Sequence, residues 1–151
     1  MNDSCPSLSS VQTAFSTALQ AALATEVAAG SVVLVPPMED FAPDLKKIAV
    51  ITALKTDLIR RVEMGGPGAV GIRSGMYVVT VSAPKGTSQK THWDVAQTLE
   101  DYFSQYSADA LPAGEGGAIY CDFPYTINAG KTPDKRLSLA VYVPWRTWAS
   151  N

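Results

Sequence analysis

The sequence is poor in the residues that most often carry chemistry. Among its 151 residues there is a single histidine, His92, and there are two cysteines, Cys5 and Cys121. One histidine and two distant cysteines form no recognisable set of metal ligands, and two cysteines make no disulfide framework. We therefore expect no metal and no cofactor, and a chain that folds in a reducing cytoplasm.

Any catalysis that depends on histidine would have to use His92. Cys121 and Asp122 are the partners that the sequence offers it, as in a small cytoplasmic hydrolase. Because His92 stands beside Trp93 at the start of an expected helix, a surface or capping role explains it as well. We expect no enzyme and keep the hydrolase as an alternative.

Charge and long apolar runs are also scarce. Charged residues make up 17% of the chain, against about 25% in typical domains. This deficit points to a surface that contacts neighbours, unless Ser, Thr, Gln and Gly supply the missing polarity. The longest uncharged helical stretch, 4–25, is rich in Ser, Thr and Gln, so the sequence predicts neither a membrane span nor a signal peptide.

The charges that are present lie in blocks of one sign. Residues 1–45 carry a net charge of −5, 46–90 of +6, 91–130 of −6 and 131–151 of +3. A pI of about 5.3 argues against a nucleic-acid reader, which would be basic with Lys and Arg on one face. The alternation favours a basic middle that packs beside acidic helices, or meets them across an interface. Alternatively, it mirrors the composition of helices and strands.

Two segments have the spacing of amphipathic helices. The first begins at Ser9 or Ser10, with Gln12 placed as in a capping box, and it ends at Gly30. The second follows Ser88, where large apolar residues recur every three or four positions and acidic residues take the other faces.

Alternating and β-branched residues predict the strands. They fall at 32–35, 46–54, 58–64, 76–83, 119–127 with an interruption at Pro124, and 137–143. Helices and strands do not alternate regularly, so we predict an α+β fold, in which an antiparallel or mixed β-sheet carries two helices on one face. Residues 1–151 suit a single domain, with 1–8 and 146–151 as flexible or interface tails.

Cationic and aromatic residues supply candidate interface positions. Arg60, Arg61 and Arg73 fall on or near an expected hairpin, where they either meet the acidic face of a neighbour or form a solvated strand face. Trp145 and Trp148 stand near the end of the chain, where they either anchor an interface or fold back on the core.

Four segments carry a resemblance to a known family. They are Phe41-Ala42-Pro43, the strand at 47–54, residues 61–64 with Gly65-Gly66 after them, and Arg73-x-Gly75-Met76-Tyr77-Val78-Val79-Thr80-Val81-x-x-Pro84-x-Gly86. Together with the helix that follows, they resemble the tail terminator (tail completion) proteins of long-tailed, lambda-like bacteriophages. The resemblance covers roughly 11–143.

The resemblance implies a non-enzymatic virion protein, assembled in the host bacterial cytoplasm without a membrane. Such a protein forms a homohexameric ring, which ends polymerisation of the tail tube, caps its head-proximal end and meets the head-completion (stopper) protein. Double-stranded DNA passes through the channel without sequence recognition. By position, Arg60, Arg61, Met64 and Arg73 are candidates for contacts with other subunits or with the tube. The alternative is another neck or tail component, either a head-tail stopper or a tube subunit.

Overall fold

The computed structural model describes residues 7–36, 39, 45–56, 60–62, 70–113, 117–131 and 136–150, with the backbone alone at 60–62, 70–72, 129–131 and 148–150. The helices are α1 (Leu8–Ala22), α2 (Ala24–Ala28) and α3 (Gln89–Ser104), and a turn of 3-10 helix, η1 (Gln105–Ser107), follows α3. The strands are β1 (Val32–Leu34), β2 (Ile48–Thr56), β3 (Arg60–Val62), β4 (Val70–Ala83), β5 (Leu111–Ala113), β6 (Gly117–Cys121), β7 (Tyr125–Lys131) and β8 (Leu137–Ser150).

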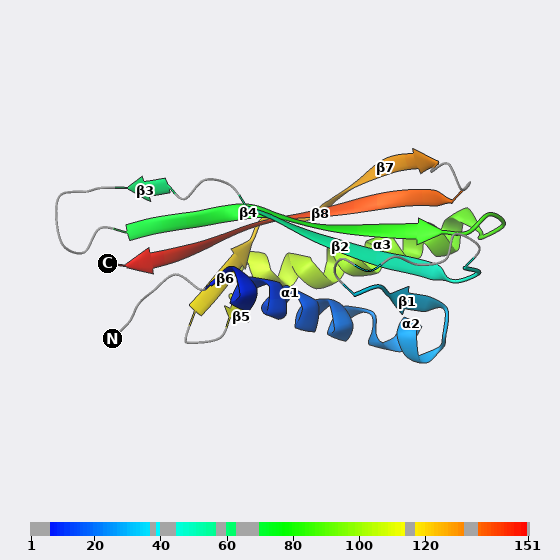
Figure 1. The fold of residues 1–151 in the computed structure, drawn as a ribbon, viewed down its shortest axis with the longest axis horizontal. Helices are drawn as coiled ribbons and strands as arrows, with labels where there is room; N and C mark the ends of the chain where they lie inside the picture. The colour runs from blue at the N-terminus through cyan, green and yellow to red at the C-terminus, as the bar shows by residue number, and fades with distance from the viewer. Residues whose placement is uncertain are drawn as a thin grey trace.

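In the described part of the chain the strands form one mixed sheet. Its order is β1-β2-β4-β8-β6-β5, with β3 beside β4 and β7 beside β8. β1 runs parallel to β2, and the other pairs are antiparallel. The 14-residue strands β4 and β8 pair along their whole length, from Val70 with Ser150 to Ala83 with Leu137. They form a central spine to which the shorter strands attach (Figure 1).

Helices α1 and α3 pack on the same face of this sheet (Figure 1). Alternation along β4 directs Tyr77, Val79 and Val81 to that face, and none of the three is exposed to solvent. Phe15 of α1 stacks on Tyr77 with 4.4 Å between ring centroids, and Phe103 of α3 lies 6.1 Å from Phe15. The predicted α+β fold, with two helices on one face of a mixed sheet, is confirmed.

The start of α1 differs from the prediction. Ser7 is the N-cap, and its hydroxyl accepts a hydrogen bond from the backbone N–H of Ser10 at 3.2 Å. The expected cap at Ser9 or Ser10 is wrong, because an N-cap hydroxyl satisfies an N–H two or three positions ahead and Ser7 already reaches that of Ser10. Ser9 and Gln12 therefore lie inside the helix.

Other helix boundaries follow local signals. α1 stops at Ala22 because Leu23 has a non-helical backbone (φ −108°, ψ 16°), and the chain continues as the short α2. Gly30 ends this region with φ +79°, a conformation that favours glycine. Ser88 caps α3, accepting the N–H of Thr91 at 3.1 Å.

The strands extend beyond the predicted segments at one end of the molecule. β4 begins at Val70, six residues before the expected start, and β8 continues to Ser150. Residues 146–150 are therefore part of the central spine, and of the two roles expected for 146–151 the interface role stays a prediction. The short strand β5, which contains Pro112, was not predicted.

Gly75 marks a close approach inside the sheet. A Cβ atom at this position would lie 2.0 Å from the carbonyl oxygen of Lys55 and 2.9 Å from Cζ2 of Trp145. No side chain fits there without moving the backbone of β2. The absence of a side chain at Gly75 thus lets the Trp145 ring lie against β4.

Arg136 ties the start of β2 to the spine. Its side chain is 2% exposed, and Nε donates to the Ser82 hydroxyl at 2.9 Å. Nη1 donates to the carbonyl of Leu45 at 2.5 Å, and Nη2 donates to the carbonyls of Lys47 and Ser82, each at 2.9 Å. The planar guanidinium thereby joins three segments that are distant in the sequence.

Candidate functional site

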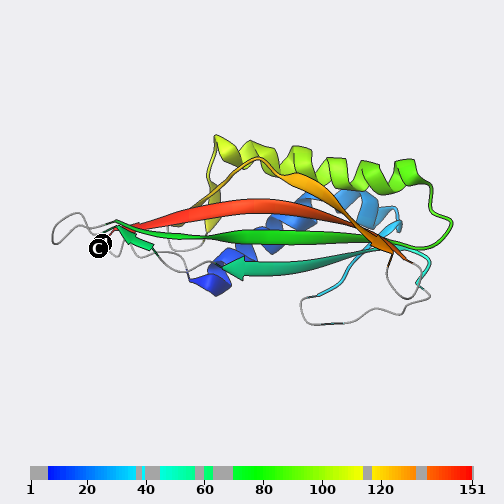
Figure 2. The same ribbon diagram turned by 90° about the horizontal axis from the view of Figure 1, so that it is seen from above.

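One lateral side of the molecule carries an acidic helix. In the view of Figure 2, α3 lies next to β8 and β7, on the side away from β2. Asp94 and Asp101 of α3 are exposed, and Lys90 pairs with Asp94 at 3.3 Å. Glu100 accepts a 2.6 Å hydrogen bond from the hydroxyl of Thr126, which joins α3 to β7. We call α3 together with β7 the acidic side.

The opposite lateral side carries lysines. Lys46 and Lys47 precede β2, Lys55 lies near its end, and all three side chains are exposed. Residues 45–56, all of which the structure describes, contain no acid. We call this segment the basic side. The two lateral sides of the sheet therefore differ in the sign of their charge.

The face of the sheet without helices carries an apolar patch. Phe123 is 74% exposed and Ile127 49% exposed. The rings of Tyr125 and Tyr142 stack with 5.3 Å between centroids and 12° between planes. Val141 and Val143 face the helices, so alternation along β8 directs Tyr142 between them to this free face. We call Tyr125, Ile127 and Tyr142, together with the exposed Phe123 just before β7, the free-face patch.

Sequence reasoning missed this patch although it had a signal. Tyr125 and Ile127 alternate with polar residues directly after Pro124, which is typical of a strand with one apolar face. Their exposure depends on the helices covering the other face, which the sequence alone does not reveal. Exposed aromatic and aliphatic side chains that gather in this way are typical of interaction surfaces.

Most of the candidate interface residues lie on one arm of the molecule. Arg60 pairs with Ile72, and Ile72 pairs on its other side with Trp148. Arg61 pairs with Gly71, and Arg73 with Thr147. The arm formed by β3, the start of β4 and the end of β8 extends past the helices (Figure 1). Met64 lies outside the described residues.

Trp145 is the candidate that the structure places elsewhere. It is 2% exposed, and its ring meets that of Phe15 edge-on with 6.3 Å between centroids. Of the two roles left open for this residue, folding back on the core is the one observed. Its odd position in β8 directs it to the helix-covered face, as for Val141 and Val143.

The residues of the alternative hydrolase are not brought together. His92 is buried at the start of α3, with Nε2 2.8 Å from the carbonyl oxygen of Val81. Cys121 ends β6, which packs beside η1 at the other end of α3. Thirteen residues of helix separate these positions, about 20 Å at a rise of about 1.5 Å per residue. A direct contact between His92 and Cys121 is therefore excluded.

Neither the buried Cys121 nor the half-buried Tyr106 has the properties of a nucleophile. Burial, with a smaller contribution from the Asp122 carboxylate, raises the pKa of the Cys121 thiol to about 12. The thiol is thus protonated at neutral pH and a poor nucleophile. Burial and the neighbouring Tyr102 also raise the pKa of Tyr106 above its usual range.

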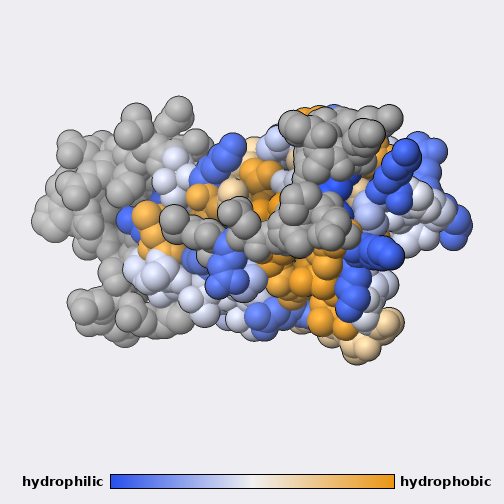
Figure 3. All heavy atoms as spheres, turned by 45° about the vertical axis from the view of Figure 1, so that its right-hand side comes forward, coloured by the Kyte–Doolittle hydropathy of each residue, from blue (hydrophilic) through white to orange (hydrophobic). Residues whose placement is uncertain are grey.

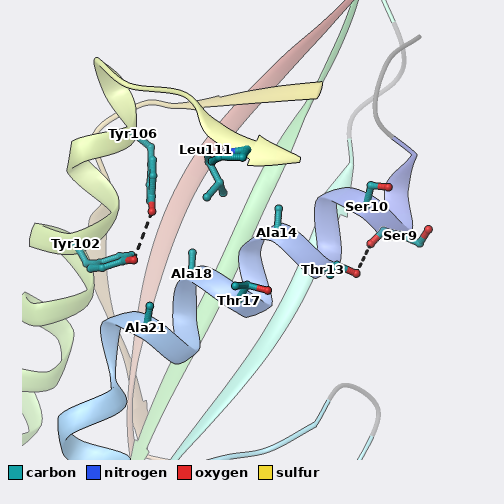
Figure 4. A pocket seen from close by; sticks show the side chains of 11 residues that line it. Ser9, Ser10, Thr13, Ala14, Thr17, Ala18, Ala21, Tyr102, Tyr106 and Leu111 are labelled. Atoms are coloured by element: carbon teal, nitrogen blue, oxygen red, sulfur yellow. Dashed lines mark hydrogen bonds between the residues drawn. The ribbon is translucent and has the colours of Figure 1, made fainter. Parts of the chain in front are cut away.

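An uncharged groove runs between α1 and the segment from α3 to β5. Its volume is about 490 Å³. Tyr102 points toward α1 near Ala18, and the hydroxyl of Tyr106 points to that of Tyr102, to which it donates with 3.4 Å between the oxygens (Figure 4). The lining residues are Ser9, Ser10, Thr13, Ala14, Thr17, Ala18, Ala21, Tyr102, Tyr106, Leu111 and Pro112. None of these side chains is an acid or a base at neutral pH.

A second, smaller groove of about 290 Å³ lies between α1 and β1. It is lined by Ser16, Leu19, Gln20, Leu34, Val35, Pro36 and Thr52. On the view in Figure 3, apolar residues reach the surface between hydrophilic side chains. Both grooves lie on the helix-covered side of the sheet.

The described residues include no group of three or more His, Cys, Asp or Glu side chains placed to hold a metal ion. Within the same part of the chain, no helix combines the length and the apolar character that crossing a bilayer requires.

Comparison with known proteins gives a likeness of fold. No protein-family model matches the sequence, and no curated protein matches it either. One solved structure, of a protein whose name states no function, is similar with a TM-score of 0.58 over 90% of this chain and 94% of the other. The two sequences are 17% identical, so what this chain shares with that protein is the fold alone.

Proposed function

We propose that this protein is a ring-forming structural component of a phage virion. In this proposal it caps the head-proximal end of the tail tube, ends tube polymerisation and joins the tail to the head-completion protein of the neck. Its partners are further copies of itself, the tail tube protein and the stopper, and double-stranded DNA passes through the ring without being read. It acts without catalysis.

The observation that carries this proposal is the opposite charge of the two lateral sides. The basic side and the acidic side lie at opposite edges of one sheet, so the acidic side of one copy is attracted to the basic side of the next. Contacts between two different surfaces of identical chains repeat head to tail, and they give a closed ring where the rotation closes. The low overall charge fits a protein that buries part of its surface in such contacts.

The arm and the free-face patch support the same proposal. The arm places Arg60, Arg61, Arg73 and Trp148 on paired strands beyond the helices, at the end of the molecule that we assign to a neighbouring subunit or to the tube. The free-face patch adds exposed aromatic side chains, which are favoured anchors in protein interfaces. Two further residues carry less weight, because Trp145 is buried and Met64 lies outside the described residues.

The test is the assembly state of the purified protein, alone and with purified tube protein. Native mass measurement should show a hexamer in at least one of these conditions, and electron micrographs should show rings at tube ends. Long tubes of the isolated protein would instead identify a tube subunit. A monomer in both conditions, with tubes growing unchecked, would overturn the proposal.

Charge reversal on the arm gives a sharper version of this test. The double substitution Arg60→Glu and Arg61→Glu should weaken assembly most at low salt, since exposed charges are screened over about 10 Å at about 0.1 M salt. The control is Lys85→Glu with Lys90→Glu, which changes the net charge equally on exposed residues at the other end of β4. Sedimentation at several salt concentrations measures the effect. Equal losses in both variants would show that net charge, and not the arm, is responsible.

A further inference from the structure

The outer edge of β7 is open in the described part of the chain. β7 pairs with β8 from Tyr125 with Tyr142 to Lys131 with Leu137, and no other described strand pairs with it. Its seven residues contain one bulge, at Asn128/Gly130, and one charge, Lys131. Natural sheets usually protect such an edge with charges, proline or a covering element, because its free N–H and C=O groups pair readily with another strand.

A second open edge of similar length lies on the other side of the sheet. β1 pairs with β2 only at Ile48–Val50, where the last contact is the N–H of Val35 with the carbonyl of Val50. No described strand lies beside the outer edge of the following six residues, Ile51–Thr56. Besides β1 and β5, which end the strand order, the described sheet thus has open edges at β7 on one side and at the second half of β2 on the other.

The directions of the strands allow these two edges to pair. β2, β4, β8 and β7 are successively antiparallel, so β7 of one copy placed beside β2 of the next continues the alternation. The faces also match. Tyr125 and Ile127 point to the free face, as do Ala53 and Lys55, whose neighbour Thr52 is paired with buried Val79 of the covered face.

Along the strand direction, the open edge of β7 and the open edge of β2 are offset, as expected for strands of a closed sheet. Through the register of β8 and β4, Ile127 lies level with Ala140, Thr80 and Ile51. β7 therefore lies level with the first part of β2, whereas the open edge covers its second part. Strands that close into a barrel tilt and stagger by a constant amount from one to the next, so an offset of this kind accompanies closure.

We propose that the second half of β2 in one copy pairs in an antiparallel manner with β7 of the next copy, which makes one sheet continuous through the assembly. The occupant of each open edge is thus a second copy of this chain. The matching faces favour that occupant, because Ala53 and Lys55 of one edge continue the free face that Tyr125 and Ile127 form at the other edge. This inference rests on the proposed ring and names the backbone groups that hold it.

Hydrogen exchange of the backbone amides tests the pairing directly. The exchange is compared between the monomer at low concentration and the assembly that forms at high concentration or on purified tube protein. Alternate amides of 51–56 and 125–131 should exchange at least about 10-fold more slowly in the assembly. Amides in the middle of β4, which are paired on both sides in the monomer, provide the internal control.

Cysteine pairs then determine the register. Ile127→Cys is combined with Ile51→Cys, Ala53→Cys or Lys55→Cys in a Cys5→Ser background, because these three residues of β2 lie on the free face at steps of two. One pair should give disulfide-linked ladders of subunits under mild oxidation. The control is Ile127→Cys with Lys90→Cys, which is not expected to give ladders.

The outcomes separate the two proposals. Protection of both segments, with ladders from one pair, supports the continuous sheet. Rings without protection of 51–56 and 125–131 overturn the strand pairing and leave the proposed function standing. Absence of any assembly, with or without tube protein, overturns both.

Discussion

The two faces of the central sheet are formed by the same strands, but helices α1 and α3 cover only one of them. On the face covered by α1 and α3, Val79, Val81, Val141 and Val143 are fully buried. On the free face, the residues between them are a mixture of buried small side chains and half-buried or exposed larger ones, such as Thr80 and Tyr142. One face is a closed protein core, whereas the other is covered by the Arg136 side chain at Ser82 and carries half-buried or exposed apolar side chains, such as Tyr142 and Ile127, further along.

This difference separates the side chains that stabilise the fold of one chain from those that can contact another protein. The covered face contains the stacked rings of Phe15 and Tyr77 and supplies the hydrophobic burial that holds the fold. The free face adds less to that burial, yet it keeps aromatic side chains that a solvated surface does not require. We therefore expect substitutions on the covered face to reduce folding stability, and those on the free-face patch to reduce association.

The largest effect is expected for Phe15→Ala. This change removes a fully buried ring that contacts Tyr77, Phe103 and Trp145, and it should lower the free energy of unfolding by about 3–5 kcal/mol. The control is Phe123→Ala in the free-face patch, where a 74% exposed ring contributes little to the monomer. Urea denaturation at low protein concentration measures both. Similar losses in the two variants would contradict the distinction between the faces.

Arg136→Leu should have the next largest effect, about 2–3 kcal/mol, because carbonyl and hydroxyl groups that now accept from a charged donor lose their partner. Leucine does not pay the cost of burying a charge, so the loss of unfolding free energy is smaller than the sum of the separate hydrogen bonds. Arg146→Leu is the matched control. Its side chain is 49% exposed and its contact with Asp122 is 3.8 Å long, so a change of about 0–1 kcal/mol is expected.

The measurement for this pair is again urea denaturation, with Arg136→Lys as a third variant. Lysine keeps the charge but not the planar fork that reaches Leu45, Lys47 and Ser82. It should therefore recover only part of the loss. Full stability in Arg136→Lys would show that the charge alone matters at this position.

Much of this comparison could be predicted from the sequence, because it depends on local patterns. The alternation at 76–83 and 137–143 and the helical spacing after Ser88 each appear within a few residues, and the strands and helix that they predict are present. The arm could not be predicted in the same way. Val70 pairs with Ser150, 80 positions away, and no local pattern encodes such a partner.

Trp145 shows the same limit at the level of one residue. From the sequence it is an aromatic residue near the end of the chain, equally suited to an interface and to a core. It is buried because Gly75, 70 residues earlier, leaves room for its ring beside β4. The two candidate surfaces depend on similar distant placements, since charge blocks in a sequence do not say which edge of a sheet will carry them.

Adjacent valines on β4 allow the faces to be compared with one residue type. Val79→Ala removes a fully buried side chain from the covered face and should cost about 2 kcal/mol. Val78→Ala, on the free face and 8% exposed, should cost about 1 kcal/mol, because water fills the space that opens. Sedimentation should show the reverse order for assembly, with the larger loss in Val78→Ala. If Val79→Ala caused the larger loss in both stability and assembly, the covered face and the free face would not have different roles.

The smallest effect, and the most specific, concerns the stacked pair Tyr125 and Tyr142. A double-mutant cycle with Tyr125→Leu and Tyr142→Leu should give a coupling of about 0.5–1.5 kcal/mol in the monomer, the range for aromatic pairs beyond their buried area. If β7 joins the next copy, the pair also lies beside that junction, and the coupling measured from the assembly equilibrium should exceed the one measured from unfolding. Equal couplings would mean that the stack only holds β7 to β8. A larger coupling in assembly would mean that the same contact prepares the edge of the sheet for its partner.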